Sequence, residues 1–394
     1  MSDNKYDVII IGSGIGGMTA ANLLAKIGKK KVLVLEQHWE PGGLTHEFKR
    51  KGKFHWDVGI HYVGKLQPGS LDTQVLDFIS EGEIKWNDMP YMYDVFHYPG
   101  LDFSVPSDKD DYKNKLITLF PEESNSIKQY FKDINKVAIW YIGYIAEKMT
   151  PPFIGFFINL FNKVNEALAL CTTGDYMEKR FKSHVLRSLL VSQWGDYGLP
   201  PRTSSFLIHS IIANHYLRGA VYPEGGASEI FKSLNSVLEK EGGIVKTSIE
   251  AKEVIIEDNQ VKGVIAIQKR GEKITEKYYA PIVISSTGAS HTYSTLLKNK
   301  VSDIYEMELK KLRGGMSATT LYLGLKEHPG KLGFKGENHW IYSDFNHDEL
   351  TTRNSILDGK PDSCFLSFPS LKTTNPKGHT AEIISFTHYD SFEK

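Results

Sequence analysis

The sequence is poor in the residues that build disulfide frameworks and metal sites. Its 394 residues include only two cysteines, Cys171 and Cys364, which lie far apart and lack the spacing of metal ligands. Disulfides persist in oxidising compartments, whereas a long chain with few cysteines suits a reducing one. We therefore expect no metal site, no disulfide framework and a cytoplasmic location.

An excess of charge of one sign is also missing. Lys and Arg total 47, Asp and Glu total 47, and no long basic run occurs, so the formal net charge is zero. Binding to the phosphates of nucleic acid needs clustered Lys and Arg. Nucleic acid is therefore excluded as the main partner, and the oligomeric state is left open.

No apolar run reaches the roughly 20 residues that a membrane span needs, and no signal peptide precedes the first predicted strand. Residues 137–170 come closest, but Lys148, the Pro151-Pro152 pair and Lys163 interrupt them. One interpretation is a pair of buried helices that is split at the double proline. The alternative is an amphipathic surface that makes a peripheral membrane contact or lines the entry for an apolar substrate.

What the sequence does contain is a strand–turn–helix–strand pattern in its first 36 residues. A β-branched run, residues 6–11, meets a glycine-rich turn, residues 12–17, which is followed by a helical stretch at 18–27 and an apolar run at 31–35 that ends at Glu36. This is the βαβ unit that binds the ADP half of a dinucleotide. A lone glycine motif could be an ordinary turn, but here all four parts are in register.

Each glycine of the turn has a physical role in that prediction. Gly12 allows a sharp turn, Gly14 lets backbone approach a pyrophosphate, and Gly17 lets the helix pack close to the sheet. The helix N-terminus offers free N–H groups to the phosphates. The Glu36 carboxylate favours a free ribose 2′-hydroxyl and disfavours a 2′-phosphate, so NADP is not expected at this site.

The rest of the chain first turns helical and then returns to strands. Residues 74–216 have a mostly helical texture, a helix is predicted at 227–241 with Gly242-Gly243 at its end, and strands follow at 243–246, 251–257, 261–268, 279–285, 319–325 and 381–387. The pattern predicts a nucleotide-binding domain that is interrupted by an insert and then resumes.

Several longer segments resemble the FAD-dependent phytoene desaturase, carotenoid isomerase and retinol saturase family. They include VLVLEQHWEPGGLTHEF, FHWDVGIHYVG, NHYLRGAVYPEGGASEI, PIVISSTGA and CFLSFPSLKTTNP. The resemblance covers nearly the whole chain. Leu44 stands where amine oxidases of the superfamily usually carry arginine, and Ile60-His61-Tyr62 follows Gly59 where carotenoid desaturases usually carry proline. These departures favour the retinol saturase branch.

The resemblance implies an α/β fold in which an FAD-binding Rossmann-like (GR2-type) domain is interrupted by a mixed α+β substrate domain. We expect the first part of the FAD domain at 1–70, a mostly helical substrate- or membrane-facing insert at 71–215, the second part at 216–290 and the continued substrate domain at 291–394. The family closes with a glycine-rich FAD segment, which we expect to be missing here.

The resemblance and the glycine chemistry together predict a set of cofactor-binding residues. Backbone contacts to the phosphates or ribityl chain are expected from one group, ribose contacts from Glu36 with Gln37 beside it, and a main-chain adenine contact from Ala251. The full set is Gly12, Ser13, Gly14, Ile15, Gly16, Gly17, Glu36, Gln37, Gly43, Leu44, Thr45, Ala251, Thr287 and Gly288.

The implied reaction is hydride exchange between flavin and a C=C bond of an apolar polyene or isoprenoid, with the chemistry residing in the cofactor. In the reducing direction a proton is also needed, and His61, Tyr62, His215 and Tyr216 are candidates by residue type; hydrogen-bonded packing residues are the alternative for each. Only one dinucleotide fingerprint is present, and FAD would occupy it. The electrons would therefore come from outside this site, either from NAD(P)H as an external donor or from another protein. Carotenoid desaturation or isomerisation, and an inactive ADP-binding or partner-binding fragment, remain alternatives.

Overall fold

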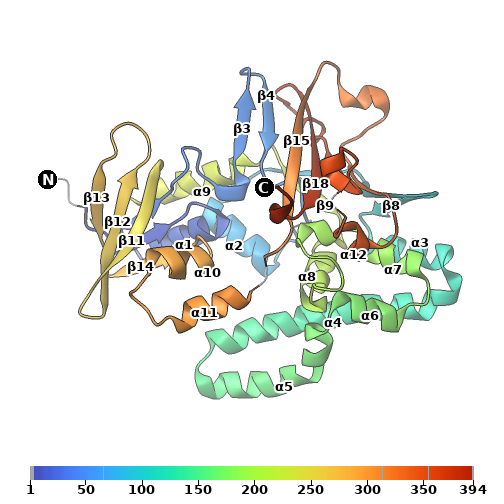
Figure 1. The fold of residues 1–394 in the computed structure, drawn as a ribbon, viewed down its shortest axis with the longest axis horizontal. Coiled ribbons are helices and arrows are strands. Elements are labelled where there is room, and N and C mark those ends of the chain that lie inside the picture. The colour runs from blue at the N-terminus through green and yellow to red at the C-terminus, as the bar shows by residue number, and fades with distance from the viewer. Residues whose placement is uncertain (1–3, 65, 313, 354, 393–394) are drawn as a thin grey trace.

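The computed structural model describes residues 4–64, 66–312, 314–353 and 355–392. Two layered bodies lie side by side (Figure 1). One is built around a four-stranded parallel sheet, and the other around a six-stranded mixed sheet with helices packed against it. The α/β class and the Rossmann-like unit that the sequence predicts are both present.

The parallel sheet has the strand order β10-β2-β1-β14. Val8 is aligned with Val32 on one side and with Ile282 on the other, and every residue of the two central strands is buried because both faces of the sheet are covered. The strands are β1 (Val8–Ile11), β2 (Val32–Leu35), β10 (Ile244–Lys246) and β14 (Ile282–Ser285).

Each face of the parallel sheet has its own core. Helices cover the face that carries Val8, Ile10, Val32 and Val34: α1 (Ile15–Lys26), α2 (Leu71–Ser80) and α9 (Ser228–Lys240). An antiparallel sheet covers the face with Ile9, Ile11, Leu33 and Leu35: β11 (Ile249–Glu257), β12 (Gln260–Gln268) and β13 (Thr275–Tyr279). The short α10 (Ala289–His291) and α11 (Ile304–Lys311) follow β14.

The single strand predicted at 279–285 is wrong. β13 ends at Tyr279 in the antiparallel layer, and β14 begins at Ile282 in the parallel sheet. Pro281 separates them, because proline has no N–H to donate to a strand neighbour.

The second sheet has the order β15-β18-β17-β16-β7-β8 and joins strands from both ends of the chain. Only the β16–β7 pair is parallel. Its strands are β7 (Met92–Tyr98), β8 (Leu101–Pro106), β15 (Ser317–Leu325), β16 (Asn338–Tyr342), β17 (Ser363–Ser367) and β18 (His379–Thr387). Its helices are α3 (Lys109–Leu119), α4 (Ser124–Met149), α5 (Pro152–Leu170), α6 (Thr173–Arg180), α7 (His184–Val191), α8 (Phe206–Tyr216) and α12 (His347–Leu350).

Short strands connect the two bodies. β3 (Glu47–Arg50) and β4 (Phe54–Asp57) form a hairpin. β9 (Ala220–Pro223) pairs with β5 (Val63–Gly64) and β6 (Trp86–Asp88). Residues near 60 and near 220 are therefore held together between the two sheets.

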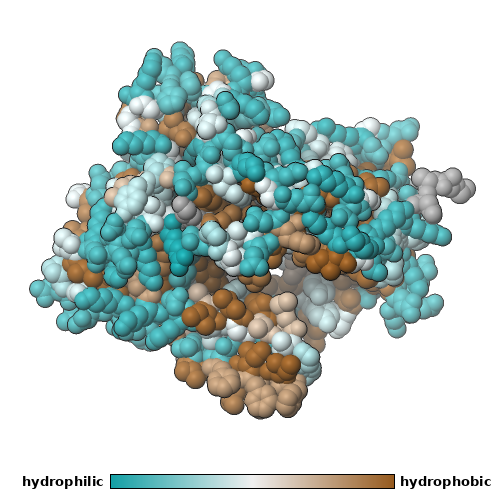
Figure 2. All heavy atoms as spheres, turned by 180° about the vertical axis from the view of Figure 1, so that it is seen from behind, coloured by the Kyte–Doolittle hydropathy of each residue, from teal (hydrophilic) through white to brown (hydrophobic). Residues whose placement is uncertain are grey.

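Helices α4 and α5 form a hairpin that projects from the second body (Figure 1). The sequence interpretation of two helices split at the double proline is confirmed, but their burial is wrong. α4 packs into the core only as far as Trp140, and beyond it apolar side chains face outward, as the brown surface at the bottom of Figure 2 shows.

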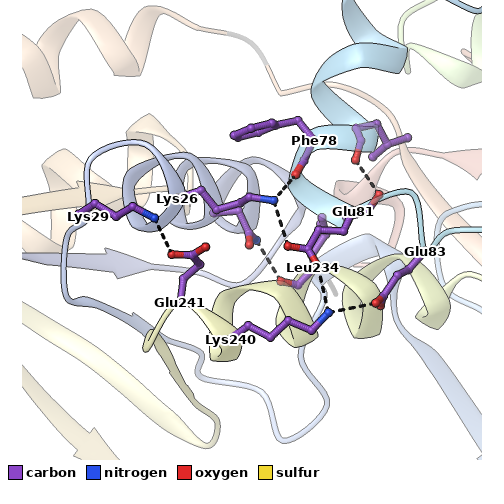
Figure 3. Close-up of polar contacts among 11 residues, drawn as sticks. Lys26, Lys29, Phe78, Glu81, Glu83, Leu234, Lys240 and Glu241 are labelled. Carbon is purple, nitrogen blue, oxygen red and sulfur yellow. Dashed lines mark hydrogen bonds and ion pairs between the residues drawn. The ribbon is translucent and has the colours of Figure 1, made fainter.

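The helical layer beside the parallel sheet is tied by lysine contacts (Figure 3). Lys26 Nζ donates to the Phe78 carbonyl oxygen at 2.8 Å and lies 3.3 Å from Glu81 Oε1, while Lys240 Nζ lies 3.0 Å from Glu81 Oε2. These contacts join α1, the end of α2 and α9. Helix α2 thus belongs to this layer although it begins at Leu71.

Candidate functional site

A cavity of about 650 Å³ lies at the carboxyl ends of the parallel strands. This is the edge of an open α/β sheet where ligands bind. Most of the predicted cofactor-binding residues line it: Gly12, Gly14, Ile15, Gly16, Glu36, Gln37, Gly43, Leu44, Ala251 and Thr287.

The glycines around this cavity have the geometry of a phosphate cradle. Gly12 has φ +99°, and a Cβ at Gly17 would lie 2.2 Å from the Gly12 carbonyl oxygen, so both positions require glycine. A Cβ at Gly43 would lie 2.9 Å from the Gly14 Cα, whereas a Cβ at Gly14 would meet no protein atom within 4 Å. The space in front of Gly14 is therefore free for a ligand, beside the N-terminus of α1.

Glu36 follows β2 directly, and hydrogen bonds from Ser13 and His38 fix the position of its carboxylate. Its Oε2 accepts hydrogen bonds from the Ser13 N–H at 2.9 Å and the Ser13 hydroxyl at 2.7 Å, and its Oε1 accepts one from the His38 N–H at 2.8 Å. Each carboxylate oxygen can accept further hydrogen bonds. The residues present therefore fit the ribose and pyrophosphate of a dinucleotide.

Four predicted residues lie behind the cavity lining. Ser13 supports Glu36 and Gly42, Gly17 packs against Gly12, and the Thr45 hydroxyl donates to the Gly42 carbonyl oxygen at 2.8 Å. Gly288, with φ +86°, precedes α10. Their cofactor roles stay predictions.

Sequence reasoning missed six lining residues. Ile11, Leu35, Glu250 and Ser286 are direct neighbours of predicted residues, so the carboxyl ends of the strands could have indicated them. His291 gave no signal, because only the short α10 brings it to the cavity. The full set is Ile11, Leu35, Ile249, Glu250, Ser286 and His291.

Of the four proton-donor candidates, the two histidines make polar contacts, and the two tyrosines are buried against each other. His61 Nδ1 is 2.7 Å from Glu382 Oε2, and His215 Nε2 accepts a hydrogen bond from the Gly64 N–H at 2.8 Å. Burial lowers the pKa of His215, and its backbone contact fits the packing alternative. Tyr62 and Tyr216 are buried and stacked with ring centroids 4.5 Å apart.

The fold and the glycine-lined cavity define a dinucleotide-binding protein of the Rossmann-like class, and residues 10–79 match the family described as NAD(P)-binding Rossmann-like domain. The chain is 32% identical to the all-trans-retinol 13,14-reductase of Danio rerio over 98% of its own length and 67% of that protein's. It therefore belongs to the all-trans-retinol 13,14-reductase family, which confirms the sequence prediction.

Two further similarities are broader. The chain is 28% identical to prolycopene isomerase 2 of an Oncidium hybrid cultivar over 95% of its length and 63% of the isomerase. An oxidoreductase from Methanosarcina mazei superposes with a TM-score of 0.63 at 17% identity, over 99% of this chain and 80% of the other, and shows the shared fold. The chain spans about two thirds or less of the length of these two curated relatives.

Proposed function

We propose that this chain is an FAD-dependent oxidoreductase that reduces a C=C bond of an apolar polyene, with a retinoid-like substrate. The main observation that supports this proposal is the cavity at the carboxyl ends of the strands, which has free space in front of the Gly14 backbone and is lined by the Glu36 carboxylate. The name of the Danio rerio relative supports the retinoid class. When bound, FAD would supply hydride transfer.

The chain's own part is to bind and orient. The N–H groups at the start of α1 would receive the pyrophosphate, and Glu36 would accept hydrogen bonds from the ribose hydroxyls. Gly43, which lies close to Gly14, and Gly59, where a Cβ would lie 2.9 Å from Leu44 Cβ, would be the next backbone segments to hold the cofactor. NAD(P)H from solution, or another protein, would supply the electrons.

Purified chain loaded with FAD, reduced without oxygen and mixed with all-trans-retinol tests this proposal. We expect the flavin absorption to return as the polyene gains one hydride and one proton. Phytoene offered to the oxidised form tests the alternative of desaturation, which the prolycopene isomerase similarity keeps open. Failure to bind FAD would leave the fragment alternative, and formation of a more conjugated product would overturn the reductase assignment.

We further propose that the exposed α4–α5 segment, residues 139–164, contacts a lipid bilayer. Its outer surface is apolar, with Met149, Phe153, Phe161 and Val164 between 74% and 82% exposed. Exposed apolar surface of this extent marks an interaction site. In the described residues, no helix has the length and hydrophobicity to cross a membrane, so the contact would be interfacial.

The inside of the same hairpin is polar, which distinguishes lipid from a protein partner. Asn159 Nδ2 donates to Glu147 Oε2 at 2.9 Å, and Asn162 Nδ2 donates to the Trp140 carbonyl oxygen at 3.4 Å. A hairpin whose polar groups are hydrogen-bonded to each other inside it, and whose outer surface is apolar, is suited to an apolar solvent rather than to water. Lys148 and Lys163 are exposed and could reach anionic headgroups.

Serine substitutions of the hairpin phenylalanines should release the chain from lipid. The variant carries Phe153→Ser, Phe156→Ser and Phe161→Ser, and vesicles of phosphatidylcholine and phosphatidylserine are floated on a density gradient. Each side chain contributes roughly 1.5–3 kcal/mol when buried, so we expect at least a tenfold loss of bound protein. Leu332→Ser, at an 82% exposed site outside the hairpin, is the control. Equal flotation of the triple variant would disprove the lipid contact.

A further inference from the structure

Tyr62 holds its hydroxyl group between two carboxyl groups. The hydroxyl oxygen lies 3.0 Å from Asp196 Oδ2 and 3.2 Å from Asp94 Oδ2. The three residues come from distant parts of the chain: the segment before β5, strand β7 and the short helix at Trp194–Asp196. A tyrosine hydroxyl carries one proton, so it can donate to only one of the two carboxyl groups.

Besides the Tyr62 hydroxyl proton, we infer that the cluster holds a further proton on the Asp196 carboxyl group. Asp94 already accepts hydrogen bonds from Gln193 Nε2 at 2.8 Å and from Asn338 Nδ2 at 3.1 Å, as a carboxylate does. The Tyr62 proton completes that set. Tyr62 can donate to either carboxyl group, so both contacts are hydrogen bonds at once only if one carboxyl group carries a proton. Because Asp94 already accepts from two amide groups, we assign that proton to Asp196, which then donates to the tyrosine oxygen.

The charges around the pair agree with this assignment. Lys372 Nζ donates to Asn338 Oδ1 at 2.6 Å and places a buried cation near Asp94. Protein packed around Asp196 and repulsion from Asp94 raise the pKa of Asp196 well above its usual range, while burial raises the pKa of Asp94 to about 7. The titratable side chains that face the pair are Tyr62, Tyr93, Tyr112, Tyr197, Tyr216, Tyr342 and Lys372.

Asp196 is the member of this cluster that is open to a ligand. Asp94 has no exposed surface and Tyr62 is 6% exposed, whereas Asp196 is exposed to solvent although protein packs closely around its carboxyl group. Its carboxyl group contacts the hydroxyl of Tyr62, whose ring is stacked with Tyr216. Next to it in the chain, a Cβ at Gly195 would lie 2.3 Å from Phe386 and 2.8 Å from Trp340. A carboxyl group among aromatic rings is a suitable neighbour for a polyene.

The cluster is also connected to the cofactor cavity. Tyr62 follows Gly59, which packs against the cavity residue Leu44. Lys372 Nζ donates to the His61 carbonyl oxygen at 2.6 Å and so fixes the same segment from the other side. The position of Tyr62 therefore depends on residues that border both the cavity and the acid pair.

We propose that Asp196, kept protonated by Tyr62 and Asp94, is the proton donor for the reduction of the polyene; this rests on the proposed function. FAD, when bound and reduced, would supply the hydride for one carbon of the C=C bond and would be left oxidised. The other carbon takes the Asp196 proton, and the O–H bond breaks to leave a carboxylate. Water then restores the proton. Tyr62 and Asp94 are positioning residues in this step.

Infrared spectroscopy of the purified chain tests the held proton without flavin or substrate. We expect a protonated-carboxyl band at pH 8, above the pKa of about 7 of Asp94. The band should disappear in Asp196→Asn and shift in Tyr62→Phe, because Tyr62→Phe removes one hydrogen-bond partner. Asp111→Asn is the matched control, since Asp111 also accepts from a tyrosine, Tyr91, but on the surface. Absence of the band, or its survival in Asp196→Asn, would overturn the inference.

Turnover measurements separate this inference from the proposed function. With FAD affinity unchanged, Asp196→Asn should reduce the rate of polyene reduction about 100-fold or more, the usual contribution of a general acid. Full activity in that variant would overturn the donor role alone. A parent chain that binds FAD but reduces no polyene would overturn the proposed function and the donor role together, even with the band present.

Discussion

Replacing Gly14 with valine is expected to leave the fold intact and to weaken FAD binding about tenfold to 100-fold. Gly14 has φ −62° and ψ 170°, an extended conformation open to any residue, and a Cβ there would meet no protein atom within 4 Å. The valine side chain would instead occupy the space before the N-terminus of α1. Overpacking costs about 1–3 kcal/mol, and 1.4 kcal/mol is a tenfold change in affinity.

FAD titration of both chains, with thermal unfolding of each without FAD, measures the effect. Gly314→Val is the matched control, because a Cβ at Gly314 also meets no atom and Gly314 lies outside the cavity lining. Equal FAD affinity of the parent and Gly14→Val would contradict the assignment of this cavity. Glu36→Ala is a less direct test, since it also removes the acceptor of the Ser13 N–H group.

Replacing Lys372 with methionine is expected to lower the free energy of unfolding by about 3–5 kcal/mol, the cost of breaking a buried charge cluster on one side. The Lys372 ammonium group donates to the His61 carbonyl oxygen, Asn338 Oδ1 and Ser367 Oγ at 2.6–2.7 Å. Burial lowers its pKa to about 8, while the carboxylates of Glu382, Asp57 and Asp94 oppose that shift. Methionine keeps the length of the side chain and removes all three donors.

Denaturant unfolding, with the midpoint and slope compared, measures this loss. Lys377→Met is the control, because Lys377 belongs to the same segment and is exposed; it should change the free energy of unfolding by no more than about 0.5 kcal/mol. A similar loss in both variants would mean that the buried cation has no special role.

The parts of this protein that could be predicted from sequence are those whose signals are local. The βαβ unit over residues 6–36 is a short pattern in which the strand period, the glycine turn and the acid lie in order, so the cavity at Gly12, Gly14 and Glu36 followed from it. The helix after residue 227 was equally local. The family resemblance added Gly43 and Ala251, which no local rule connects to that turn.

The parts that could not be predicted depend on pairing between distant segments. Nothing in residues 92–106 shows that β7 and β8 extend a sheet whose other four strands begin after residue 316. The Tyr62, Asp94 and Asp196 cluster has the same origin, since each residue alone has an ordinary sequence context. The apolar run at 137–170 was visible, but its polar interior depends on which face α5 presents to α4.

The strand order of the cofactor sheet has a consequence for how the chain is synthesised. β1 and β2 form its centre, but the outer strands come much later in the chain: β10 begins 209 residues and β14 247 residues after β2 ends at Leu35. Until Ser285 has left the ribosome, the apolar strands of the nascent chain have unpaired edges, and such edges promote aggregation. We therefore expect this protein to fold late during translation and to depend on chaperones that shield strand edges, although its recognisable motif is among the first residues made.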